Sequence, residues 1–371
     1  MKIAMIGAKR VPSREGGIEV VVEELAVRMV QAGHQVDVYN RRGGHVSGKD
    51  LPTYHGRSYQ GIRLISVPTL EVKGFNALIY SWLATARALF GHYDVIHFHA
   101  SGPCAALPLA KLFGIRTVAT LHGIDSMRSK WGGMASAYLR FGEKMAAKCA
   151  DELIVLSEGN RDYIRTTYGR DCRLIPNGIS EPVPAARETV EAMGLVPGRY
   201  LLYLGRIVPE KGLHYLIEAY RKIQTDVPLV IAGGASHTED YLEKIRAMAQ
   251  EDPRIHMTGF VEGERLRALF QYAQIFILPS DLEGMPMALL EAMSYGNCCL
   301  VSDIPENRSV VGDCGVCFRH GDVEDLRKEL GSLLADEARR EDLRSRAAEH
   351  VLSAYNWDAI TQQTLQLYQK T

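Results

Sequence analysis

The sequence predicts an α/β protein made of two doubly wound domains, and three observations support this. Short apolar runs of strand length alternate with longer segments that carry apolar residues at helical spacing, which is typical of a parallel sheet covered on both faces. The second half of the chain repeats the scheme of the first. Prolines at positions 182, 184 and 197 interrupt the periodicity between the halves. We therefore expect a first domain over residues 1–185 and a second over residues 186–355.

The first half begins with a strand that runs directly into Gly7. Ile18–Gln31 is a predicted helix because apolar residues recur every three or four positions and Gly33 follows its end. The predicted strands are Lys2–Ile6, Val36–Tyr39, Ile62–Val67, Val95–Phe98, Thr117–Leu121 and Glu152–Leu156, and the other predicted helices are Ala77–Phe90, Cys104–Phe113 and Ala135–Cys149.

The second half follows the same order. Its predicted strands are Tyr200–Leu204, Leu229–Ala232, Ile255–Thr258, Ile275–Leu278 and Cys299–Ser302. Its predicted helices are Leu213–Ile223, Asp240–Gln250, Glu264–Tyr272, one that begins near Pro286, Val323–Asp336, Arg339–Ala354 and Asp358–Gln369. In this architecture a ligand is expected in the cleft where the carboxyl ends of the strands of the two domains face each other.

Composition indicates a soluble globular protein, with 46% hydrophobic and 23% charged residues. The seven cysteines are an odd number without a disulfide-like framework, which fits a reducing, cytoplasmic compartment. Cys314-x-x-Cys317 could form a zinc site only with further ligands such as Cys298 and Cys299, and we favour buried thiols. The N-terminal apolar run is too short for a signal peptide, and no uncharged apolar stretch reaches the length of about 18 residues that a membrane span needs.

Charge is distributed unevenly between the halves. Residues 1–185 hold 23 Lys and Arg against 16 Asp and Glu, whereas residues 186–371 hold 20 against 28. A basic first half and an acidic second half indicate different partners for the two domains, although chance scatter of surface charge remains the alternative. We expect no nucleic-acid partner.

Two loops of the first half follow strand ends. Gly16-Gly17 stands directly before a helix and would allow a phosphate or sugar to approach the backbone, although the pattern is not the G-x-G-x-x-G of dinucleotide-binding proteins. His122-Gly123 follows another strand, where an imidazole could donate to a sugar oxygen. A simple turn and a buried core histidine are the alternatives. His97 and His99 are weaker candidates.

Two loops of the second half carry charge. Arg206 and Lys211 stand in a loop that Gly205 and Gly212 frame, a setting that suits a diphosphate because arginine binds oxygens bidentately and lysine supplies a point charge. The strand Ile275–Leu278 leads into a turn and a helix that carry Glu283 and Glu291. A helix N-terminus attracts phosphate and carboxylates bind hydroxyls, so the pair indicates a ligand with both groups. A buried helix with a glutamate cap is the alternative.

Together these motifs resemble the retaining GT-B glycosyltransferases of family 4. The resemblance rests on Gly205-Arg-x4-Lys211-Gly212, Glu283-x7-Glu291, Asn177-Gly178 and the Gly16-Gly17 loop, and it runs nearly end to end. The opening Ile6–Gly17 also resembles a rhamnosyltransferase-like subgroup of bacterial polysaccharide assembly. The resemblance implies two Rossmann-like domains facing across a cleft, an acceptor-binding first domain, a donor-binding second domain, and a C-terminal helix over residues 356–371 that crosses back to the first domain.

The resemblance also implies roles for the matched residues. Arg206 and Lys211 would bind the donor diphosphate, Glu291 the ribose hydroxyls, and Glu283 the donor sugar. His122 would lie by the reacting face of that sugar. Further positions of the implied donor site are Gly16, Gly17, Phe260, Val261, Gly284, Met285 and Met287. Two departures are Pro286, where the family often has glycine, and Cys298-Cys299, where Pro-Val is common.

The sequence contains no Asp-x-Asp, so we expect cations and helix N-termini, rather than a metal ion, to stabilise the leaving diphosphate. No resident cofactor is expected. The co-substrate is a nucleotide sugar, with UDP-sugars favoured and dTDP- or GDP-sugars as alternatives. Rival functions are a glycosidase that uses Glu283 and Glu291, a GT-B sugar-nucleotide epimerase, and a non-catalytic nucleotide-sugar binding protein.

The acceptor is expected to be a saccharide or a polyprenyl-diphosphate-linked saccharide, bound by the first domain. Arg140, Lys144 and Lys148 recur at helical spacing, and Asp125 and Arg128 lie just upstream. Such a basic stripe suits anionic lipid or a lipid diphosphate, which indicates a peripheral location on the cytoplasmic face of the membrane. A solvated helix face is the alternative.

Overall fold

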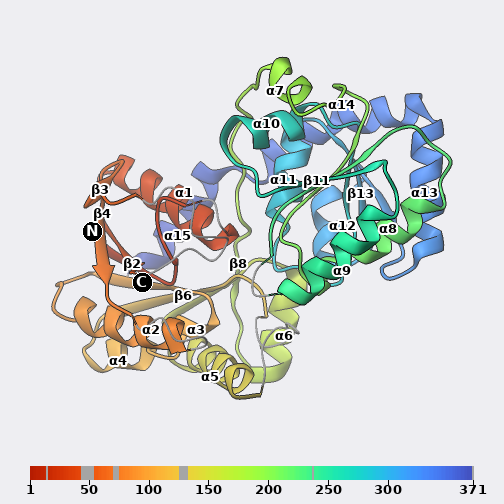
Figure 1. The fold of residues 1–371 in the computed structure, drawn as a ribbon. Coiled ribbons are helices and arrows are strands. Elements are labelled where there is room, and N and C mark those ends of the chain that lie inside the picture. Colours follow the sequence, from red (N-terminus) through yellow and green to blue (C-terminus); the bar gives the residue numbers. More distant parts are fainter. Residues whose placement is uncertain (14–15, 43–53, 70–74, 125–132, 236–237, 370–371) are drawn as a thin grey trace. The chain divides into compact units, whose positions relative to one another are not determined.

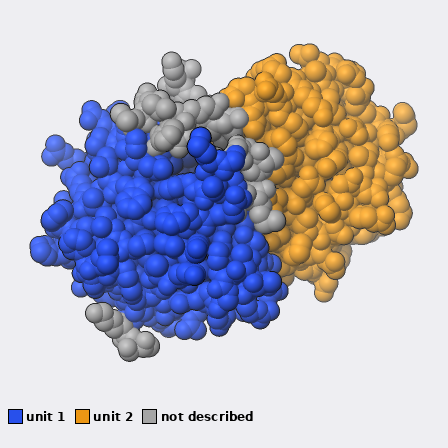
Figure 2. All heavy atoms as spheres, turned by 90° about the horizontal axis from the view of Figure 1, so that it is seen from below, with its two compact units in different colours: residues 1–178, 357–371 blue, residues 179–356 orange. Residues whose placement is uncertain are grey.

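The computed structural model describes residues 1–13, 16–42, 54–69, 75–124, 133–235 and 238–369, which form two compact units (Figures 1 and 2). Unit 1 comprises Met1–Gly178 together with Trp357–Thr371, and unit 2 comprises Ile179–Asn356. Each unit has one sheet with helices on both faces, so the doubly wound architecture predicted from the alternating pattern is confirmed.

The chain passes into unit 2 between Gly178 and Ile179, earlier than the proline pattern indicated. The Ile179 N–H donates to the Tyr355 carbonyl at 2.7 Å, which attaches the segment to unit 2 from its first residue. Ala185 belongs to the core of unit 2, and its carbonyl accepts from the Tyr272 hydroxyl at 3.0 Å. Residues 179–185 therefore lie along unit 2 rather than in unit 1.

The sheet of unit 1 has the order β3-β4-β2-β1-β5-β6-β7-β8, and every neighbouring pair is parallel except β3 with β4. Its strands are β1 (Lys2–Ile6), β2 (Gln35–Arg41), β3 (Ser58–Tyr59), β4 (Ile62–Val67), β5 (Val95–His99), β6 (Arg116–Leu121), β7 (Glu152–Val155) and β8 (Arg173–Leu174). The central strands are buried on both faces, as expected for parallel strands, although β5 and β6 also carry polar residues such as His97, His99 and Thr120.

Helices cover both faces of this sheet. They are α1 (Gly17–Gln31), α2 (Phe75–Ala88), α3 (Ser101–Cys104), α4 (Leu107–Leu112), α5 (Gly133–Cys149), α6 (Glu158–Tyr168) and α15 (Trp357–Tyr368). Helices α2, α4 and α5 contribute Tyr80, Leu107 and Ala146 to one core, whereas α15 packs against α1 on the other side (Figure 1). The predicted helix Cys104–Phe113 is wrong in one respect. It is broken into α3 and α4, because Pro108 lacks the N–H that a continuous helix would need.

The sheet of unit 2 is wholly parallel, with the order β11-β10-β9-β12-β13-β14. Its strands are β9 (Leu201–Leu204), β10 (Leu229–Ala232), β11 (Ile255–Gly259), β12 (Ile275–Leu278), β13 (Cys298–Ser302) and β14 (Val316–Phe318). Its helices are α7 (Arg187–Glu191), α8 (Leu213–Arg221), α9 (Glu239–Gln250), α10 (Gly263–Gln271), α11 (Met287–Ser294), α12 (Pro305–Val311), α13 (Val323–Ala335) and α14 (Glu337–Ala354), and Pro209–Lys211 forms one 3₁₀ turn, η2.

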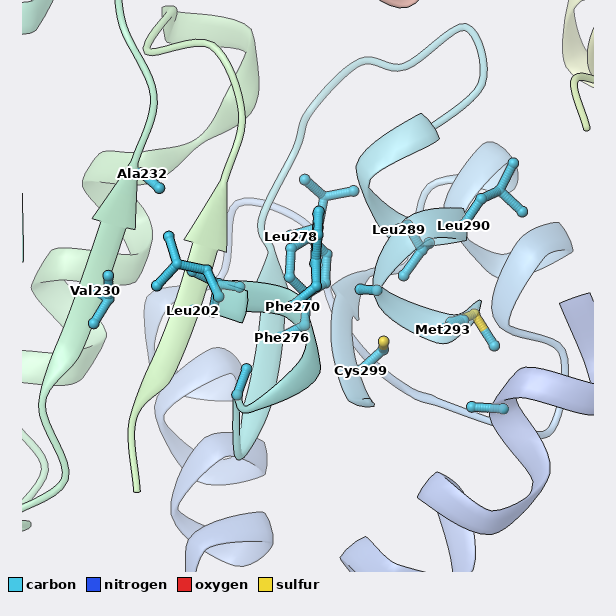
Figure 3. Packing of buried hydrophobic residues seen from close by; sticks show 14 of the residues in the cluster. Leu202, Val230, Ala232, Phe270, Phe276, Leu278, Leu289, Leu290, Met293 and Cys299 are labelled. Atoms are coloured by element: carbon cyan, nitrogen blue, oxygen red, sulfur yellow. The ribbon is translucent and has the colours of Figure 1, made fainter. Parts of the chain in front are cut away.

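The core on one face of this sheet fixes the position of α11. Figure 3 shows Leu289 and Met293 of α11 beside Leu278 of β12 and Cys299 of β13. All four side chains are buried, with at most 1% of their surface exposed. Such burial stabilises each large side chain by about 1.5–3 kcal/mol, so α11 is held firmly over the end of β12.

Helix α15 returns the chain to unit 1. Arg28 of α1 donates to Asp358 at 2.9 Å, and Arg116 of β6 donates twice to the Leu367 carbonyl, at 2.8 and 3.0 Å. The Tyr368 hydroxyl lies 2.6 Å from Nδ1 of His97, in the core. The predicted crossing of the last helix back to the first domain is confirmed.

Candidate functional sites

Each sheet has one point at which the strand order reverses, and ligands of doubly wound proteins bind outside the carboxyl ends of the strands at such points. In unit 1 the reversal lies between β1 and β5, and in unit 2 it lies between β9 and β12. The loops that follow β1, β9 and β12 contain Gly16, Arg206, Lys211 and Glu283 among the residues singled out in the sequence. We describe the two sites separately.

In unit 2 the loops after β9 and β12 are in direct contact. Gly212 has φ of +63°, and a Cβ atom there would lie 2.0 Å from the Pro279 carbonyl oxygen. The Glu210 carbonyl accepts from the backbone N–H groups of Asp281 and Leu282, at 2.9 and 3.4 Å. Glycine at position 212 is therefore required both by the left-handed backbone and by the close approach of the neighbouring loop.

This contact brings Lys211 and Glu283 together. Nζ of Lys211 donates to Oε1 of Glu283 at 2.5 Å, and the Ser280 hydroxyl donates to the same oxygen at 2.7 Å. The Ser280 carbonyl accepts from Ser302 on β13 at 2.5 Å, which holds the turn. The side chains of Lys211 and Glu283 are only 15% and 6% exposed, so this is a largely buried ion pair at the mouth of the sheet.

Arg206 lies in the same loop as Lys211. Its carbonyl accepts from the buried Tyr203 hydroxyl at 2.9 Å. Burial raises the pKa of Tyr203 well above its ordinary value, the carboxylates of Glu283 and Glu210 raise it further, and the charge of Arg206 lowers it. These charges are therefore gathered around one neutral phenol. Arg206 and Lys211 place two cations beside the end of β9.

Helix α11 begins directly after the Glu283 turn. Pro286 occupies its N-cap position, and the Pro286 carbonyl accepts from the N–H groups of Leu289 and Leu290 at 3.0 and 3.1 Å. No side chain caps the helix, so the alternative that Glu283 is a helix cap is wrong. Gly284 is buried, Met285 and Met287 are half-buried, and Glu291 lies half-buried in the second turn.

Phe260 and Val261 follow β11, which is the edge strand of the sheet. Val261 is buried in the core and Phe260 is half-buried. Because β11 is separated from β9 by β10, these residues lie on the same edge of the sheet as Lys211 but two strands away.

In unit 1 the loop after β1 approaches the end of β5. Gly7 has φ of +137°, and a Cβ atom there would lie 2.1 Å from the His99 carbonyl oxygen. The Gly7 N–H donates to the Tyr80 hydroxyl at 3.1 Å. Glycine is required here for the same reasons as at Gly212 of unit 2.

Gly16 and Gly17 stand at the start of α1. The buried carboxylate of Glu19 accepts from the Lys9 N–H at 2.9 Å, and a Cβ atom on Gly16 would lie 2.5 Å from the other oxygen of Glu19. An acidic group in the first turn is favoured by the helix dipole. The predicted open approach to the backbone at these glycines is thus partly occupied by the protein's own carboxylate.

Three histidines form a row at the ends of β5 and β6. Nδ1 of His99 lies 3.1 Å from Nε2 of His122, and Nε2 of His97 lies 2.7 Å from the Thr120 hydroxyl. The rings of His97 and His99 are 4.0 Å apart between centroids. Burial and then the charge of His122 lower the pKa of His97 to about 3, and burial lowers that of His99 well below its usual range. His97 and His99 are therefore neutral at physiological pH, and His122 lies at the end of the row.

The remaining predicted residues lie elsewhere. Arg140, Lys144 and Lys148 project from the exposed face of α5, and Asp125 and Arg128 lie outside the described residues. All seven cysteines are free thiols, and burial raises the pKa of Cys298 to about 11. Within the described ranges, no group of three or more His, Cys, Asp or Glu side chains could hold a metal ion, so the alternative of a cysteine zinc site is not supported.

Several residues of these sites were missed in the sequence. Ser280 supports Glu283, Tyr203 lies under Arg206, and Glu19 fills the turn before α1. Ser280 lies three residues before Glu283, and Glu19 lies three residues after Gly16. A polar residue so close to a candidate ligand loop could have been predicted from the sequence to support that loop. Tyr203 lies inside an apolar strand, where its hydroxyl could not be assigned a partner.

The chain matches two family descriptions. Residues 15–181 match "Glycosyltransferase Family 4", and residues 194–350 match "Glycosyl transferases group 1". Together the two matched segments cover most of the chain, which therefore has the domain pair of a GT4-type glycosyltransferase. In the part of this glycosyltransferase that the structure describes, no helix is long and apolar enough to cross a membrane.

Curated relatives are similar over their whole length. The chain is 28% identical to the "Alpha-maltose-1-phosphate synthase" of Mycolicibacterium smegmatis, covering 100% of this chain and 99% of the relative. It is 26% identical to the "D-inositol 3-phosphate glycosyltransferase" of Xylanimonas cellulosilytica, covering 95% and 91%.

Solved structures share the GT-B fold. Sucrose-phosphate synthase from Thermosynechococcus elongatus has a TM-score of 0.83 at 22% identity, covering 99% of this chain and 98% of that one. Anabaena HepE, solved with UDP-glucose, has a TM-score of 0.79 at 15% identity, with 98% of each chain covered. The glycosyltransferase WaaG has a TM-score of 0.76 at 17% identity, with 100% of each covered.

Proposed function

We propose that this glycosyltransferase moves a sugar from a nucleoside diphosphate sugar to a saccharide acceptor. The observation that carries the proposal is the pair of cations, Arg206 and Lys211, at the strand-order reversal of unit 2, with Lys211 positioned by Glu283 at 2.5 Å. Two cations in a glycine-framed loop suit a diphosphate, and they stabilise the charge that develops on it as the sugar leaves.

The donor is assigned to unit 2. Arg206 and Lys211 bind the diphosphate, and the backbone of Gly284–Met287 at the start of α11 adds N–H groups and the positive end of a helix dipole. Glu283 and Glu291 bind hydroxyls of the sugar and of the ribose, respectively. Phe260 and Val261 lie toward the base, at the edge of the same sheet. A UDP-sugar is the proposed donor, and the UDP-glucose complex of the HepE neighbour supports that choice.

The acceptor is assigned to unit 1. His122 lies at the end of a row of histidines of which His97 and His99 are neutral, so the row presents hydrogen-bonding groups rather than a cluster of positive charge. Such groups suit the hydroxyls of a sugar. Gly16 and Gly17 are assigned to the same loop region, where the carboxylate of Glu19 disfavours a second anion and favours a hydroxyl-bearing ligand.

We propose that transfer retains the anomeric configuration and needs no metal ion. The sequence has no Asp-x-Asp to bridge a metal to the diphosphate, and Arg206 and Lys211 supply the positive charge instead. In front-face attack the leaving phosphate accepts the proton of the acceptor hydroxyl while the new bond forms on the side that the phosphate leaves. No protein nucleophile is then required.

The proposed role is assembly of cell-surface polysaccharide or glycolipid, on a saccharide or polyprenyl-diphosphate-linked acceptor at the cytoplasmic face of the membrane. The Ile6–Gly17 segment, similar to that of rhamnosyltransferase-like enzymes, supports this role. One curated relative is named as an alpha-maltose-1-phosphate synthase, whose named product is different, so the acceptor has to be identified by experiment.

A donor panel tests the proposal. The purified chain is mixed with UDP-, dTDP-, GDP- and ADP-sugars, and thermal stability and nucleoside diphosphate release are measured with and without a mixture of saccharides. We expect one nucleotide class to raise the unfolding temperature, since a ligand at 100 times its Kd stabilises by about 2.7 kcal/mol. NMR of the anomeric proton of the product then reports retention.

The same panel separates the rivals. Hydrolysis of simple glycosides without any nucleotide would identify a glycosidase, although Oε1 of Glu283 already accepts two hydrogen bonds and is poorly placed as a general acid. Conversion of the donor sugar without an acceptor would identify an epimerase. Donor binding without turnover on any acceptor would identify a binding protein.

A further inference from the structure

Exposed apolar side chains of unit 1 gather on the outer face of three helices. Of the ten large hydrophobic residues exposed among those that the structure describes, seven lie on α2, α4 and α5 or within two residues of their ends. These seven are Trp82, Leu83, Phe90, Leu112, Phe113, Met134 and Phe141. We call this surface the α2–α4–α5 face.

The three helices form one continuous layer. Helix α4 contacts both α2 and α5, and α3 lies between α2 and α5. Tyr138 of α5 lies against Trp82 of α2. In Figure 1 the layer runs along the lower side of unit 1, the side from which Figure 2 is drawn. The exposure is large, since Phe90, Leu112 and Met134 are 79%, 83% and 88% exposed.

Among the residues that the structure describes, the exposed charges of this face all have one sign. Its exposed ionisable residues are Arg87, Lys111, Arg140, Lys144 and Lys148. Glu143 is the single acidic residue in the three helices, and it is fully buried, where it accepts from the hydroxyls of Tyr163 and Tyr168. Lys111 is paired with Asp151, just beyond α5, so the cationic character is strongest along α5.

Apolar and cationic residues share the exposed stripe of α5. Met134, Phe141 and Lys148 recur seven residues apart, and Arg140 and Lys144 lie beside them on the same stripe. An apolar patch of this kind on a soluble unit marks an interaction surface. Tryptophan, phenylalanine and leucine interleaved with lysine and arginine suit the boundary between lipid headgroups and acyl chains.

We propose that the α2–α4–α5 face binds the surface of a bilayer that contains anionic lipid. Positive charge on every exposed ionisable group complements negative headgroups, and the aromatic and aliphatic side chains enter the interface. A second copy of the chain fits less well, because a two-fold contact would place Arg140, Lys144 and Lys148 against their own copies. The inference rests on the proposed function in one respect. If the acceptor is linked to a lipid, it lies in a membrane, and the bound α2–α4–α5 face would bring unit 1 to it.

Vesicle sedimentation tests the proposal with the full chain. We expect binding to phosphatidylcholine vesicles that contain phosphatidylglycerol, and weak binding to phosphatidylcholine alone. Arg140→Glu with Lys144→Glu and Lys148→Glu should lower the partition coefficient by at least about tenfold, since each cation near an anionic surface contributes about fivefold. Phe90→Ser with Phe141→Ser should lower it as well, and this loss should persist at high salt, which screens the charges.

The matched control carries the same change of charge on unit 2. Lys222, Lys244 and Arg246 are exposed residues of α8 and α9 or adjacent to them, and their replacement by glutamate should leave vesicle binding within about twofold. An equal loss of vesicle binding in the control would show that binding depends only on the net charge of the chain, and it would overturn the proposal. Failure of the unaltered chain to bind anionic vesicles would also overturn it.

Two further measurements make the outcome decisive. Sedimentation velocity reports self-association, and a dimer that disappears in Phe90→Ser with Phe141→Ser would assign the face to a second copy instead. Donor-dependent thermal stabilisation is measured on every variant, which verifies that each one is folded. Vesicle binding without stabilisation by any donor would refute the proposed function but not the proposed membrane-binding face. Stabilisation by a donor without vesicle binding would refute the membrane-binding face alone.

Discussion

The two units present different chemistry at the same topological position. In unit 1 the reversal of strand order is bordered by imidazoles, two of which burial keeps neutral, and in unit 2 it is bordered by the Lys211–Glu283 ion pair and Arg206. In both, a glycine with positive φ, Gly7 or Gly212, lets one loop contact the backbone of the other. In doubly wound proteins the architecture determines where a ligand lies, and we propose that the loop residues of these two units determine whether its charge or its hydroxyls are recognised.

The largest expected effect comes from breaking the ion pair of unit 2. Lys211→Ala leaves the 6% exposed carboxylate of Glu283 without its cation, and removing one partner of a buried pair costs about 3–5 kcal/mol. We expect turnover to fall by at least about 100-fold and local unfolding in unit 2 to become easier by about 3 kcal/mol. Hydrogen exchange followed by mass spectrometry resolves the two units.

Lys222→Ala is the matched control for that experiment. Nζ of Lys222 also lies 2.5 Å from a carboxylate, that of Glu324, but both side chains are more than half exposed. Exposed pairs contribute little to stability, so exchange and turnover should change little. Equal effects of the two substitutions would show that the burial of the Lys211–Glu283 pair does not increase its contribution to stability or turnover.

A smaller effect, shared by both units, is expected at the close-contact glycines. Gly7→Ala and Gly212→Ala combine a left-handed backbone with Cβ contacts of 2.1 and 2.0 Å to a carbonyl oxygen, so one loop must move away from the other. We expect losses of about 2–4 kcal/mol and weaker ligand binding by the altered unit alone, measured by denaturant unfolding and ligand titration.

Gly114→Ala and Gly194→Ala separate the two causes. Their φ values are +70° and +74°, and a Cβ atom there would meet nothing within 4 Å. Only the backbone term remains, about 1 kcal/mol. If these controls cost as much as Gly7→Ala and Gly212→Ala, the contact between loops contributes nothing.

The last expected effect, confined to acidic solution, is a dependence of the stability of unit 1 on pH. Because burial lowers the pKa of His97 to about 3 and that of His99 well below 6.5, the unfolded chain binds more protons than the folded one below pH 6.5. The free energy of unfolding therefore falls as pH drops below 6.5, by up to about 1.4 kcal/mol per pH unit for each histidine.

Tryptophan fluorescence measures this in unit 1 specifically, because all three tryptophans, Trp82, Trp131 and Trp357, belong to that unit. His97→Gln should flatten the pH dependence between pH 6.5 and 5. His256→Gln replaces an exposed histidine of unit 2 and should leave the curve unchanged. A slope that His97→Gln does not alter would assign the pH dependence to other groups.

The sequence was sufficient for elements whose cause is local. Ile275–Leu278 was predicted as a strand and is one, because four apolar residues followed by Pro279 have few other solutions. Helix α6 was missed, because it buries little beyond Ile164, although Ser157 at its N-cap and Gly169 at its C-cap were usable signals. The strands β3 and β8 have two residues each and no periodicity to detect.

The candidate sites divide in the same way. Lys211 and Glu283 were each singled out from their own loops, but their ion pair joins residues 72 positions apart and depends on β9 and β12 being neighbours. The row formed by His97, His99 and His122 likewise depends on the pairing of β5 with β6. The sequence was enough to single out these residues by type and position, whereas their partners could be identified only once the order of the strands was known.

The return of α15 to unit 1 has a consequence for synthesis on the ribosome. Unit 2 is complete in sequence at Asn356, whereas unit 1 still lacks the helix that buries Tyr368 against His97 and bonds Leu367 to Arg116. Unit 1 is therefore completed after unit 2, only when α15 has left the exit tunnel. Until then, the α1 and β6 surfaces that α15 covers are exposed in the nascent chain.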